Sequence, residues 1–536
     1  MNAIQPGESF RAGWTGHRLI FSCGMSTPDV SSHKPESALR HAIEKPSEYG
    51  WRQWSGWVLG PGALILTLVL NPPAGLSDVG WHTAGAAALM AIWWITEAVP
   101  IPVTALVPLV LFPCLGLGSI TAVAAPYANP LVFLFLGGFL IALAMQRWGL
   151  HRRVAIGLVA ALGTRPDRIV LGFLLAGALV SMWVSNTATA LMMLPIAASV
   201  VALVPKSDGG STGPGRDFGP ALMLAVAYGA TTGGMATLIG TPPNALLAGY
   251  LNKVYGFEIG FGQWMLIGVP VTMLALPLVF WVLTRVSFKL GRDPVTGMAK
   301  LLATEQAKMG RFSRGEKWVA LVFGLTAMGW IVRPFLDNRW PMLSDTSIAI
   351  AGAVVLFLLP INLKRGEFVM TWEATKALPW DVLLLFGGGL SLAGMIQTHG
   401  LSEYLGTLCG ALNGWPIVLI VAVICFGMLM LTELTSNTAT AATFLPIVGA
   451  VAISLGQNPL LLLVPTALAA NCSYMMPVGT PPNAIVFGSG VLRLPQMAKA
   501  GLVLNLALVP VVVLVVWLLG PWVLGLQLGV LPDWVK

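Results

Sequence analysis

The chain has 536 residues, of which 56% are hydrophobic and only 10% are charged, and its formal net charge is +8. A soluble domain usually carries about 25% charged residues because its surface faces water. So low a charged fraction excludes an ordinary soluble protein and predicts a surface that faces lipid. The positive charge does not indicate a nucleic-acid partner, since Lys and Arg are concentrated between apolar segments, as in cytoplasmic loops.

The predicted elements begin after a polar N-terminal tail, residues 1–50, which lacks the long apolar core of a signal peptide. A membrane-spanning helix needs about 20 mostly apolar residues. Candidate segments follow at 55–71, 82–115, 130–146, 168–184, 187–204, 219–238, 262–284, 317–333, 346–362, 380–396, 416–434, 438–456, 459–475 and 498–526. Several are short, doubled or interrupted by Gly and Pro, so we expect about eleven spans plus re-entrant hairpins.

Two polar joints rich in Lys and Arg, 147–168 and 285–317, interrupt the apolar segments. The positive-inside rule places both in the cytoplasm. The second joint lies near the middle of the chain. We therefore expect a first repeat half at 51–290, a cytoplasmic linker at 291–316 and a second repeat half at 317–536.

The two halves share three motifs in the same order. The first half reads FLGGFLIALAMQRWGL, SNTATALMMLPI and GTPPNA, and the second reads FGGGLSLAGMIQTHGL, TSNTATAATFLPI and GTPPNA. Ser436 lies 251 residues after Ser185, and Thr480 lies 239 residues after Thr241. The loop at 205–218 accounts for the difference in spacing. The chain is therefore a duplicated fold, although hydropathy alone does not decide whether the copies are parallel or inverted.

Each copy carries three neutral polar residues inside a long apolar stretch: Ser185, Asn186 and Thr187, and Ser436, Asn437 and Thr438. Ser and Asn are common N-cap residues, so each tripeptide is predicted to begin a half-helix within the membrane. The unpaired N–H groups and positive dipole end at such a start, together with hydroxyl and amide donors, suit an anion. Small polar residues also bridge packed membrane helices, but two copies in register favour a binding site.

Fixed charges are absent from the segments around these tripeptides. No Asp, Glu, Lys or Arg occurs at 169–205, 218–252 or 434–492. A bare anion in a low-dielectric site is costly, and a cation bound beside it would offset that cost. The sequence therefore predicts symport of an anion with a cation.

The two GTPPNA motifs are the candidate cation ligands. Consecutive prolines interrupt a helix and leave backbone carbonyls unpaired. Such carbonyls are tolerated at membrane depth only when they are buried in protein, face water or hold a cation. Oxygen ligands favour hard ions such as Na⁺, although the motif does not separate Na⁺ from protons, and a structural kink is the alternative interpretation.

These motifs, with WWITEAVPIPVTALVPLVLFP at 93–113 and MQRWGLHRR at 145–153, resemble the divalent anion:sodium symporter family over roughly residues 50–536. The resemblance implies an all-α integral membrane fold of two inverted repeats, with about eleven transmembrane helices and two re-entrant hairpins. It also implies a homodimer in which fixed scaffold domains carry transport domains that move as elevators.

By position, the resemblance implies that both SNT tripeptides hold substrate carboxylates. It implies a first Na⁺ site at Ser181, Ser185, Asn186 and Gly240, and a second at Thr432, Thr435, Asn437 and Gly479. The expected function is import of C4-dicarboxylates such as succinate, malate and fumarate with Na⁺, across a bacterial inner membrane. A dicarboxylate or tricarboxylate exchanger and a sulfate symporter of the same fold are the alternatives.

Other functional classes and residues carry less weight. A channel is a different functional class, which would require a continuous pore and currents far above the turnover of a carrier. An enzyme needs a catalytic group in the duplicated site, where only Glu433 and Cys472 are near, so no enzymatic activity is expected. Membrane carboxylates are candidates by default: Glu97 is expected to support scaffold folding, and Glu433, which adjoins the second site, is a candidate for tuning cation binding. The five cysteines, Cys23, Cys114, Cys409, Cys425 and Cys472, are interpreted as packing residues.

Overall fold

The computed structural model describes residues 49–204, 214–336, 340, 342–408, 412 and 414–535. Almost all of the expected N-terminal tail and most of the 205–218 loop therefore lie outside the described residues, as do Cys23 and Cys409. The folded unit begins at Gly50 and includes both repeat halves, which do not separate from one another.

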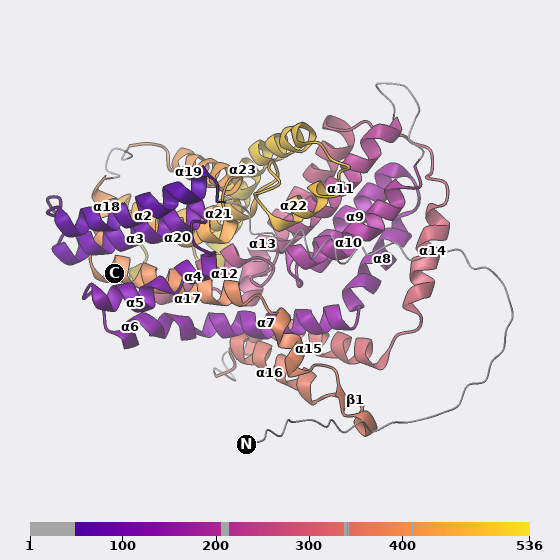
Figure 1. The fold of residues 1–536 in the computed structure, drawn as a ribbon, viewed down its shortest axis with the longest axis horizontal. Helices are drawn as coiled ribbons and strands as arrows, with labels where there is room; N and C mark the ends of the chain where they lie inside the picture. The colour runs from indigo at the N-terminus through magenta and orange to yellow at the C-terminus, as the bar shows by residue number, and fades with distance from the viewer. Residues whose placement is uncertain are drawn as a thin grey trace, which may run out of the picture. The chain divides into compact units, whose positions relative to one another are not determined.

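Helices dominate the described regular structure (Figure 1). The first half contains α2 (Trp51–Val69), α3 (Asp78–Thr96), α4 (Ile101–Thr104), α5 (Val107–Cys114), α6 (Ile120–Ala124), η1 (Ala125–Ala128), α7 (Pro130–Arg147), α8 (Leu150–Leu162), α9 (Pro166–Ser181), α10 (Asn186–Val201), α11 (Pro214–Gly234), α12 (Pro242–Tyr255), α13 (Phe261–Trp281) and η2 (Val282–Val286).

A linker helix, α14 (Met298–Met309), connects this half to the second. The second half contains α15 (Arg314–Leu336), α16 (Asp345–Leu358), β1 (Pro360–Asn362), η3 (Leu363–Arg365), β2 (Glu367–Phe368), η4 (Trp372–Ala377), α17 (Trp380–Thr398), α18 (Leu401–Leu408), α19 (Ile417–Thr432), α20 (Asn437–Ser454), α21 (Pro459–Asn471), α22 (Pro481–Phe487), α23 (Leu494–Leu524) and η6 (Asp533–Val535). Strands β1 and β2 form a small antiparallel ribbon.

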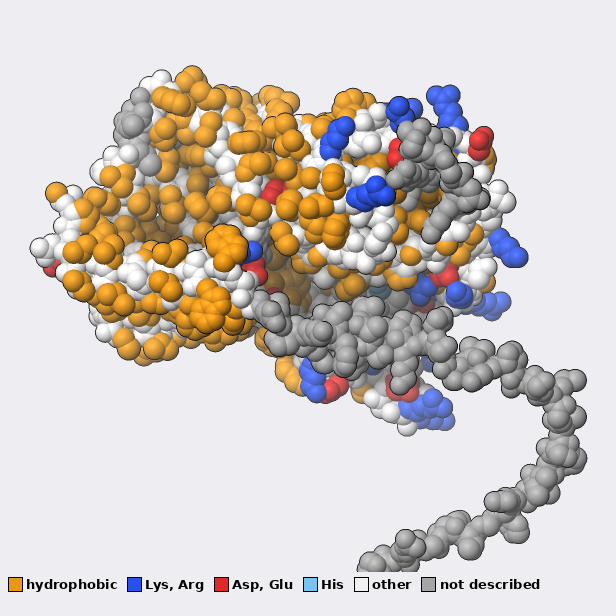
Figure 2. Space-filling model, turned by 45° about the horizontal axis from the view of Figure 1, so that its top comes forward, with side chains coloured by type: hydrophobic (Ala, Val, Ile, Leu, Met, Phe, Trp, Pro, Cys, Tyr) orange, Lys and Arg blue, Asp and Glu red, His pale blue; other side chains and the backbone are white. Residues whose placement is uncertain are grey.

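Several helices have the length and composition of membrane spans. Six qualify on both counts within the described residues: Ile120–Arg147, Phe261–Val286, Arg314–Leu336, Trp380–Thr398, Asn437–Ser454 and Leu494–Leu524. Large apolar side chains remain exposed along α2, α13, α15 and α23, and hydrophobic side chains cover much of the face shown in Figure 2. The all-α integral membrane fold is therefore confirmed, while the total of about eleven spans stays a prediction.

The repeated motifs lie on two matching series of elements, α7–α13 and α17–α23. Each series has a long helix, a shorter helix, a hairpin of two helices, a broken helix and a final long helix. In the hairpins, α9 and α10 both pack on α11, and α19 and α20 both pack on α21. The helices α9, α10 and α19 have 16 residues each, about 24 Å of length, against a hydrocarbon core of about 30 Å. These pairs lie where the sequence predicts the re-entrant hairpins, and their longest arm, α20 with 18 residues, is also one of the six candidate spans.

The second arms of the hairpins cross between the repeats. Helix α10 of the first repeat packs against α22 of the second, and α20 of the second packs against α12 of the first. The second contact is the first with the two repeats exchanged. Such an exchange implies an approximate two-fold relation between the halves. Both tripeptides begin an arm of this crossed arrangement, so the fold brings the motifs of the two repeats into one central region.

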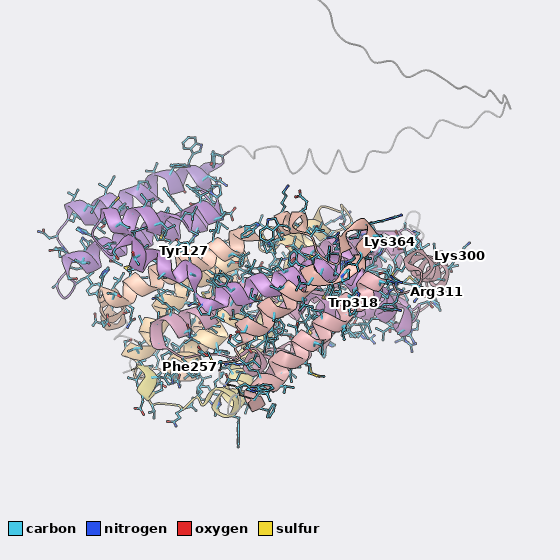
Figure 3. The ribbon with its side chains drawn as sticks, turned by 90° about the horizontal axis from the view of Figure 1, so that it is seen from below. Tyr127, Phe257, Lys300, Arg311, Trp318 and Lys364 are labelled. Carbon is cyan, nitrogen blue, oxygen red and sulfur yellow. The ribbon has the colours of Figure 1, made fainter. Side chains whose placement is uncertain are left out.

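Basic residues lie mainly toward one end of the folded unit. Lys300 and Arg311 of the linker lie near this end together with Lys364, away from Tyr127 and Phe257 (Figure 3). Most of the Lys and Arg side chains in Figure 2 lie toward the same end. By the positive-inside rule we expect this end to face the cytoplasm.

Candidate ion and substrate site

The first GTPPNA motif lies at a break between α11, which ends at Gly234, and α12, which begins at Pro242. The prolines do not themselves form the break, contrary to our interpretation of the sequence. They occupy the first two positions of α12, where a missing N–H costs nothing. The amide of Asn244 donates to the carbonyls of Thr237 (2.8 Å) and Gly234 (3.3 Å), so the motif's asparagine holds the break together.

The first hairpin tip lies directly against this break. Ser181 Oγ donates to Asn186 Oδ1 at 2.5 Å, and a methyl group on Gly234 would approach that oxygen to 2.6 Å. A methyl group on Gly240 would overlap the carbonyl oxygen of Gly234. Ser185 accepts a hydrogen bond from the backbone of α10 at 3.3 Å and is the predicted N-cap. The residues of the predicted first Na⁺ site therefore lie together.

The second break lies between α21 and α22 and repeats this geometry. Asn483, which corresponds to Asn244, donates to the carbonyls of Ser473 and Met476 at 3.1 Å each. A methyl group on Gly479 would overlap Ser473 Oγ and would approach the carbonyl oxygen of Thr432 to 3.2 Å. Thr432 and Gly479, two residues of the predicted second Na⁺ site, therefore meet at this break.

The remaining residues of the second site differ from those of the first. Ser436 is the N-cap of α20 but makes no side-chain cap bond. Thr435 Oγ1 donates to the carbonyl of Leu431 at 2.8 Å and lies 2.7 Å from Thr440 Oγ1. Asn437 Oδ1 is buried and finds no hydrogen-bond donor in the described part of the chain. All six residues of the two SNT tripeptides are half-buried.

Glu433 joins the second hairpin tip to the second break. The residue is only 3% exposed, and all of the groups around its carboxylate donate to it, as an ionised carboxylate requires. The donors, at 2.6–3.1 Å, are the backbone N–H groups of Tyr474, Met475 and Met476, the hydroxyl of Ser473 and the amide of Asn505. Glu433 therefore has a structural role that the sequence left open, and it brings negative charge to the second site.

Hydrogen bonds also join the two breaks to each other. Asn471 donates to Asn244 Oδ1 at 2.8 Å. The hydroxyls of Thr232 and Tyr474 lie 2.9 Å apart, and Tyr228 donates to the Tyr474 carbonyl at 2.7 Å. The two breaks are therefore one connected unit.

Among the described residues, no buried Lys or Arg side chain accompanies this unit. Among the residues that the structure describes, the buried acidic residues are Glu305, Glu316, Asp345 and Glu433, and no Lys or Arg is buried. A doubly negative substrate would therefore depend on N–H groups, hydroxyls, helix dipoles and bound cations.

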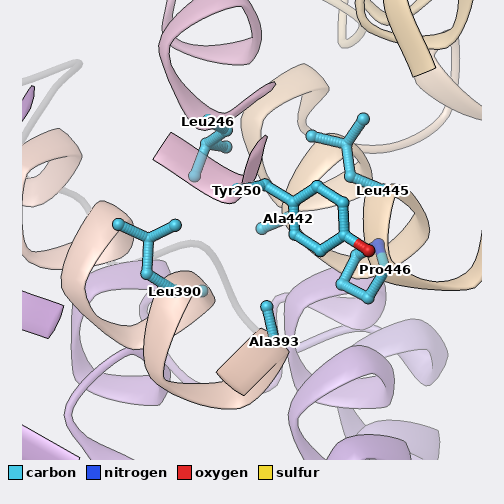
Figure 4. Close-up of a pocket in the computed structure, with 8 residues that line it drawn as sticks. Leu246, Tyr250, Leu390, Ala393, Ala442, Leu445 and Pro446 are labelled. Carbon is cyan, nitrogen blue, oxygen red and sulfur yellow. The ribbon is translucent and has the colours of Figure 1, made fainter. Parts of the chain in front are cut away.

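Two cavities lie elsewhere in the fold. A small one where α12, α17 and α20 meet is apolar apart from the Tyr250 hydroxyl (Figure 4) and does not suit a dianion. A groove of about 440 Å³ is lined by α18 and by residues 450–454 of α20, about 20 Å along α20 from its SNT tip. Neither cavity is lined by an SNT residue.

Glu97 and His399 lie away from the breaks. Glu97 ends α3 with φ of 52° and pairs with Arg52 at 3.4 Å, which agrees with its expected role in the scaffold. His399 Nδ1 lies 2.8 Å from Thr83 Oγ1. Sequence reasoning missed Asn244, Asn471 and Asn483 as supporting residues. The one available signal was the recurrence of asparagine in both GTPPNA motifs.

Paired hairpin tips that face paired helix breaks, inside a largely apolar helical fold, are typical of a membrane transporter. The sodium:sulfate symporter transmembrane region model matches residues 53–526, so the chain belongs to that family. The protein is accordingly a multi-pass membrane transporter and not an enzyme, and its predicted location in the plasma membrane is confirmed.

Curated relatives match nearly the whole chain. The sodium-dependent dicarboxylate transporter SdcS of Staphylococcus saprophyticus is 44% identical over 485 residues, 89% of this chain and 93% of SdcS. The SdcS of Staphylococcus aureus strain USA300 is 41% identical over 492 residues, covering 91% and 94% of the two chains.

Solved structures share the fold at low identity. The YdaH transporter of Alcanivorax borkumensis aligns with a TM-score of 0.54 at 16% identity, covering 88% of this chain and 98% of YdaH. MtrF of Neisseria gonorrhoeae aligns with a TM-score of 0.52 at 13% identity, covering 90% and 97%. At these identities the likeness concerns the fold alone.

Proposed function

We propose that this protein imports C4-dicarboxylates such as succinate, malate and fumarate together with Na⁺. The observation that carries the proposal is the duplicated tip-and-break site, which offers donors and dipoles but no buried Lys or Arg among the described residues. Relatives that are 40–44% identical are named sodium-dependent dicarboxylate transporters. Na⁺ is the co-transported ion in this proposal because it supplies the positive charge that the site lacks.

The two SNT tripeptides bind the two carboxylates of the substrate in this proposal. One Na⁺ is coordinated by oxygens of Ser181, Ser185, Asn186 and Gly240, and another by oxygens of Thr432, Thr435, Asn437 and Gly479. The contacts of Ser181 with Asn186 and of Gly479 with Thr432 support this grouping. Asn437 Oδ1, buried without a donor, suits a cation ligand.

Transport proceeds in this proposal by an elevator movement within a homodimer. The hairpins and broken helices, α9–α13 and α19–α23, pack on one another through α9·α11, α19·α21, α13·α23 and α10·α22, which supports a body that moves as a unit. The other helices, including α2–α7 and α15–α17, would form the fixed scaffold. The tip residue Trp183 stacks on Trp330 of α15, with ring centroids 6.5 Å apart, so this contact must change when the body moves.

Uptake of labelled succinate into proteoliposomes tests the proposal. We expect uptake to require an inward Na⁺ gradient and to cease when choline replaces Na⁺. Equal uptake with and without the gradient would exclude symport, and uptake that depends on internal dicarboxylate would indicate an exchanger. Competition by fumarate and malate, but not by sulfate or citrate at equal concentration, would identify the substrate class.

A further inference from the structure

Asn471, the last residue of α21 in the second repeat, reaches into the break of the first repeat. Its amide donates to Asn244 Oδ1 at 2.8 Å and to the carbonyl of Ala467 at 3.0 Å. Asn471 is 1% exposed and Asn244 is fully buried. The bond between them joins residues that are 227 positions apart in the chain. It therefore links the second repeat to the break of the first.

This bond fixes which way the Asn244 side chain points. The oxygen accepts from Asn471, so the amide nitrogen must face the break, where it donates to the carbonyls of Thr237 and Gly234. These carbonyls belong to the short segment that leads to Gly240. Asn471 therefore acts, through Asn244, on the backbone beside the first proposed Na⁺ site.

The second break has no equivalent bridge among the described residues. Asn483 reproduces two of the three carbonyl contacts of Asn244, but its Oδ1 finds no donor among these residues. Thr232 occupies the position that corresponds to Asn471, and its hydroxyl pairs with Tyr474 instead. The bridge is therefore a feature of the first site and not a general requirement of the duplicated fold.

We propose that Asn471 is a positioning residue for the first Na⁺ site, which it serves from the opposite repeat by holding Asn244 in its donating orientation. Without Asn471, Asn244 Oδ1 loses the one donor that it has among the described residues, in a fully buried place, and the Asn244 amide is free to turn away from the break. The inference rests on the proposed function, because it assigns a role in Na⁺ binding. It goes beyond that function by placing control of one cation site in the other repeat.

Na⁺ binding measured without substrate tests this inference. Purified protein is melted over a range of NaCl concentrations, with choline chloride keeping the ionic strength constant. We expect Asn471→Ala to raise the half-saturating Na⁺ concentration about tenfold, which corresponds to about 1.4 kcal/mol. Asn471→Leu, which keeps the side-chain size, should do the same and serves if the alanine variant folds poorly. Thr466→Val is the matched control, because this buried hydroxyl in α21 bonds only to its own helix.

A double-mutant comparison separates positioning from simple stabilisation. If Asn471 acts through Asn244, Asn244→Ala combined with Asn471→Ala should shift the Na⁺ dependence no further than Asn244→Ala alone. Multiplicative shifts, or a lower melting temperature at all Na⁺ concentrations with unchanged half-saturation, would overturn the inference. If the wild-type protein itself showed neither a Na⁺-specific melting shift nor Na⁺-driven uptake, the proposed function would fail, and the inference would fail with it.

Discussion

The two breaks share a sequence motif and the hydrogen bonds from its asparagine to two equivalent backbone carbonyls, but they are supported by different residues. In the first, residues 235–241, Thr237 donates to the carbonyl of Met182 in the hairpin tip at 2.6 Å. In the second, residues 472–480, the carboxylate of Glu433 binds three consecutive backbone N–H groups. Met182 and Glu433 occupy equivalent positions, 251 residues apart.

This difference shows that the two repeats keep the backbone of the break more strictly than the side chains that join the break to the hairpin tip. One repeat joins tip to break through a hydroxyl and a carbonyl, and the other uses a buried carboxylate. A carboxylate near the second break also adds an attraction for a cation that the first break lacks. We therefore expect the second site to bind Na⁺ more tightly than the first.

The largest effect should follow from Glu433→Ala. Five neutral donor groups would lose their acceptor in a buried place, and each buried donor left unsatisfied typically costs about 1–3 kcal/mol. We expect little folded protein by size-exclusion chromatography in detergent. A substitution at the equivalent position of the first repeat, Met182→Leu, should leave folding unchanged, because Met182 accepts the hydrogen bond from Thr237 with its backbone carbonyl. A Glu433→Ala protein as stable as the wild type would show that the two breaks do not differ as described.

The next largest effect should come from the motif glycines. A methyl group at Gly240 would overlap the backbone of Gly234, whereas one at Gly479 would overlap the side chain of Ser473. Both Gly→Ala variants should lose Na⁺-driven uptake. Ser473→Gly should restore part of the uptake to the Gly479→Ala protein, because a side chain can be removed and a backbone cannot. Uptake near the wild-type rate in Gly240→Ala would refute the close packing of the first break.

The sequence predicted the repeat, the hairpins and the tips, since these depend on local patterns such as polar N-cap residues inside apolar stretches. It did not predict the supporting groups. The bond between Asn471 and Asn244 joins non-equivalent positions of the two repeats, so the alignment of the copies conceals it. Glu433 stood out as a membrane carboxylate, but four of its five donors come from a break about 40 residues further along the chain, and the fifth, Asn505, comes from α23. From the sequence we placed the prolines in the break because proline interrupts a helix. The structure shows that they begin the next helix, and the sequence alone does not reveal where that helix starts.

A smaller and more specific difference concerns the tip asparagines. Asn186→Ala and Asn437→Ala should both lose uptake, because each removes a proposed ligand of Na⁺ and substrate. Without Na⁺, the two substitutions should change the melting temperature differently. Asn186→Ala leaves the buried Ser181 hydroxyl without its acceptor and should cost about 1 kcal/mol. Asn437→Ala removes a buried oxygen that has no donor, so its melting temperature should stay level or rise. Equal losses of stability would remove this distinction between the tips.

The smallest effect concerns the helices that precede the hairpins. Helix α8 is tied to the linker helix α14 by Arg152 and Glu305, 2.6 Å apart, with Lys308 also 2.6 Å from Glu305. The hydrogen bond from Lys308 lowers the pKa of Glu305, so this carboxylate stabilises the fold above its unfolded pKa, and the contribution is lost as pH falls through the lower folded pKa.

Glu305→Gln should therefore cost about 0.5 kcal/mol at pH 7, the range of partly exposed ion pairs. The difference from the wild type should shrink as pH falls below the ordinary Glu pKa of about 4.3, and should vanish only below the lower folded pKa, where the side chain at this position is uncharged in both proteins. Lys376→Gln is the control, since its exposed pair with Glu373 lies away from α8. Melting temperatures at low and high salt would check the origin of the effect. A Glu305→Gln penalty that persists below the folded pKa of Glu305, or in 1 M NaCl, would point to packing of α14 instead of charge.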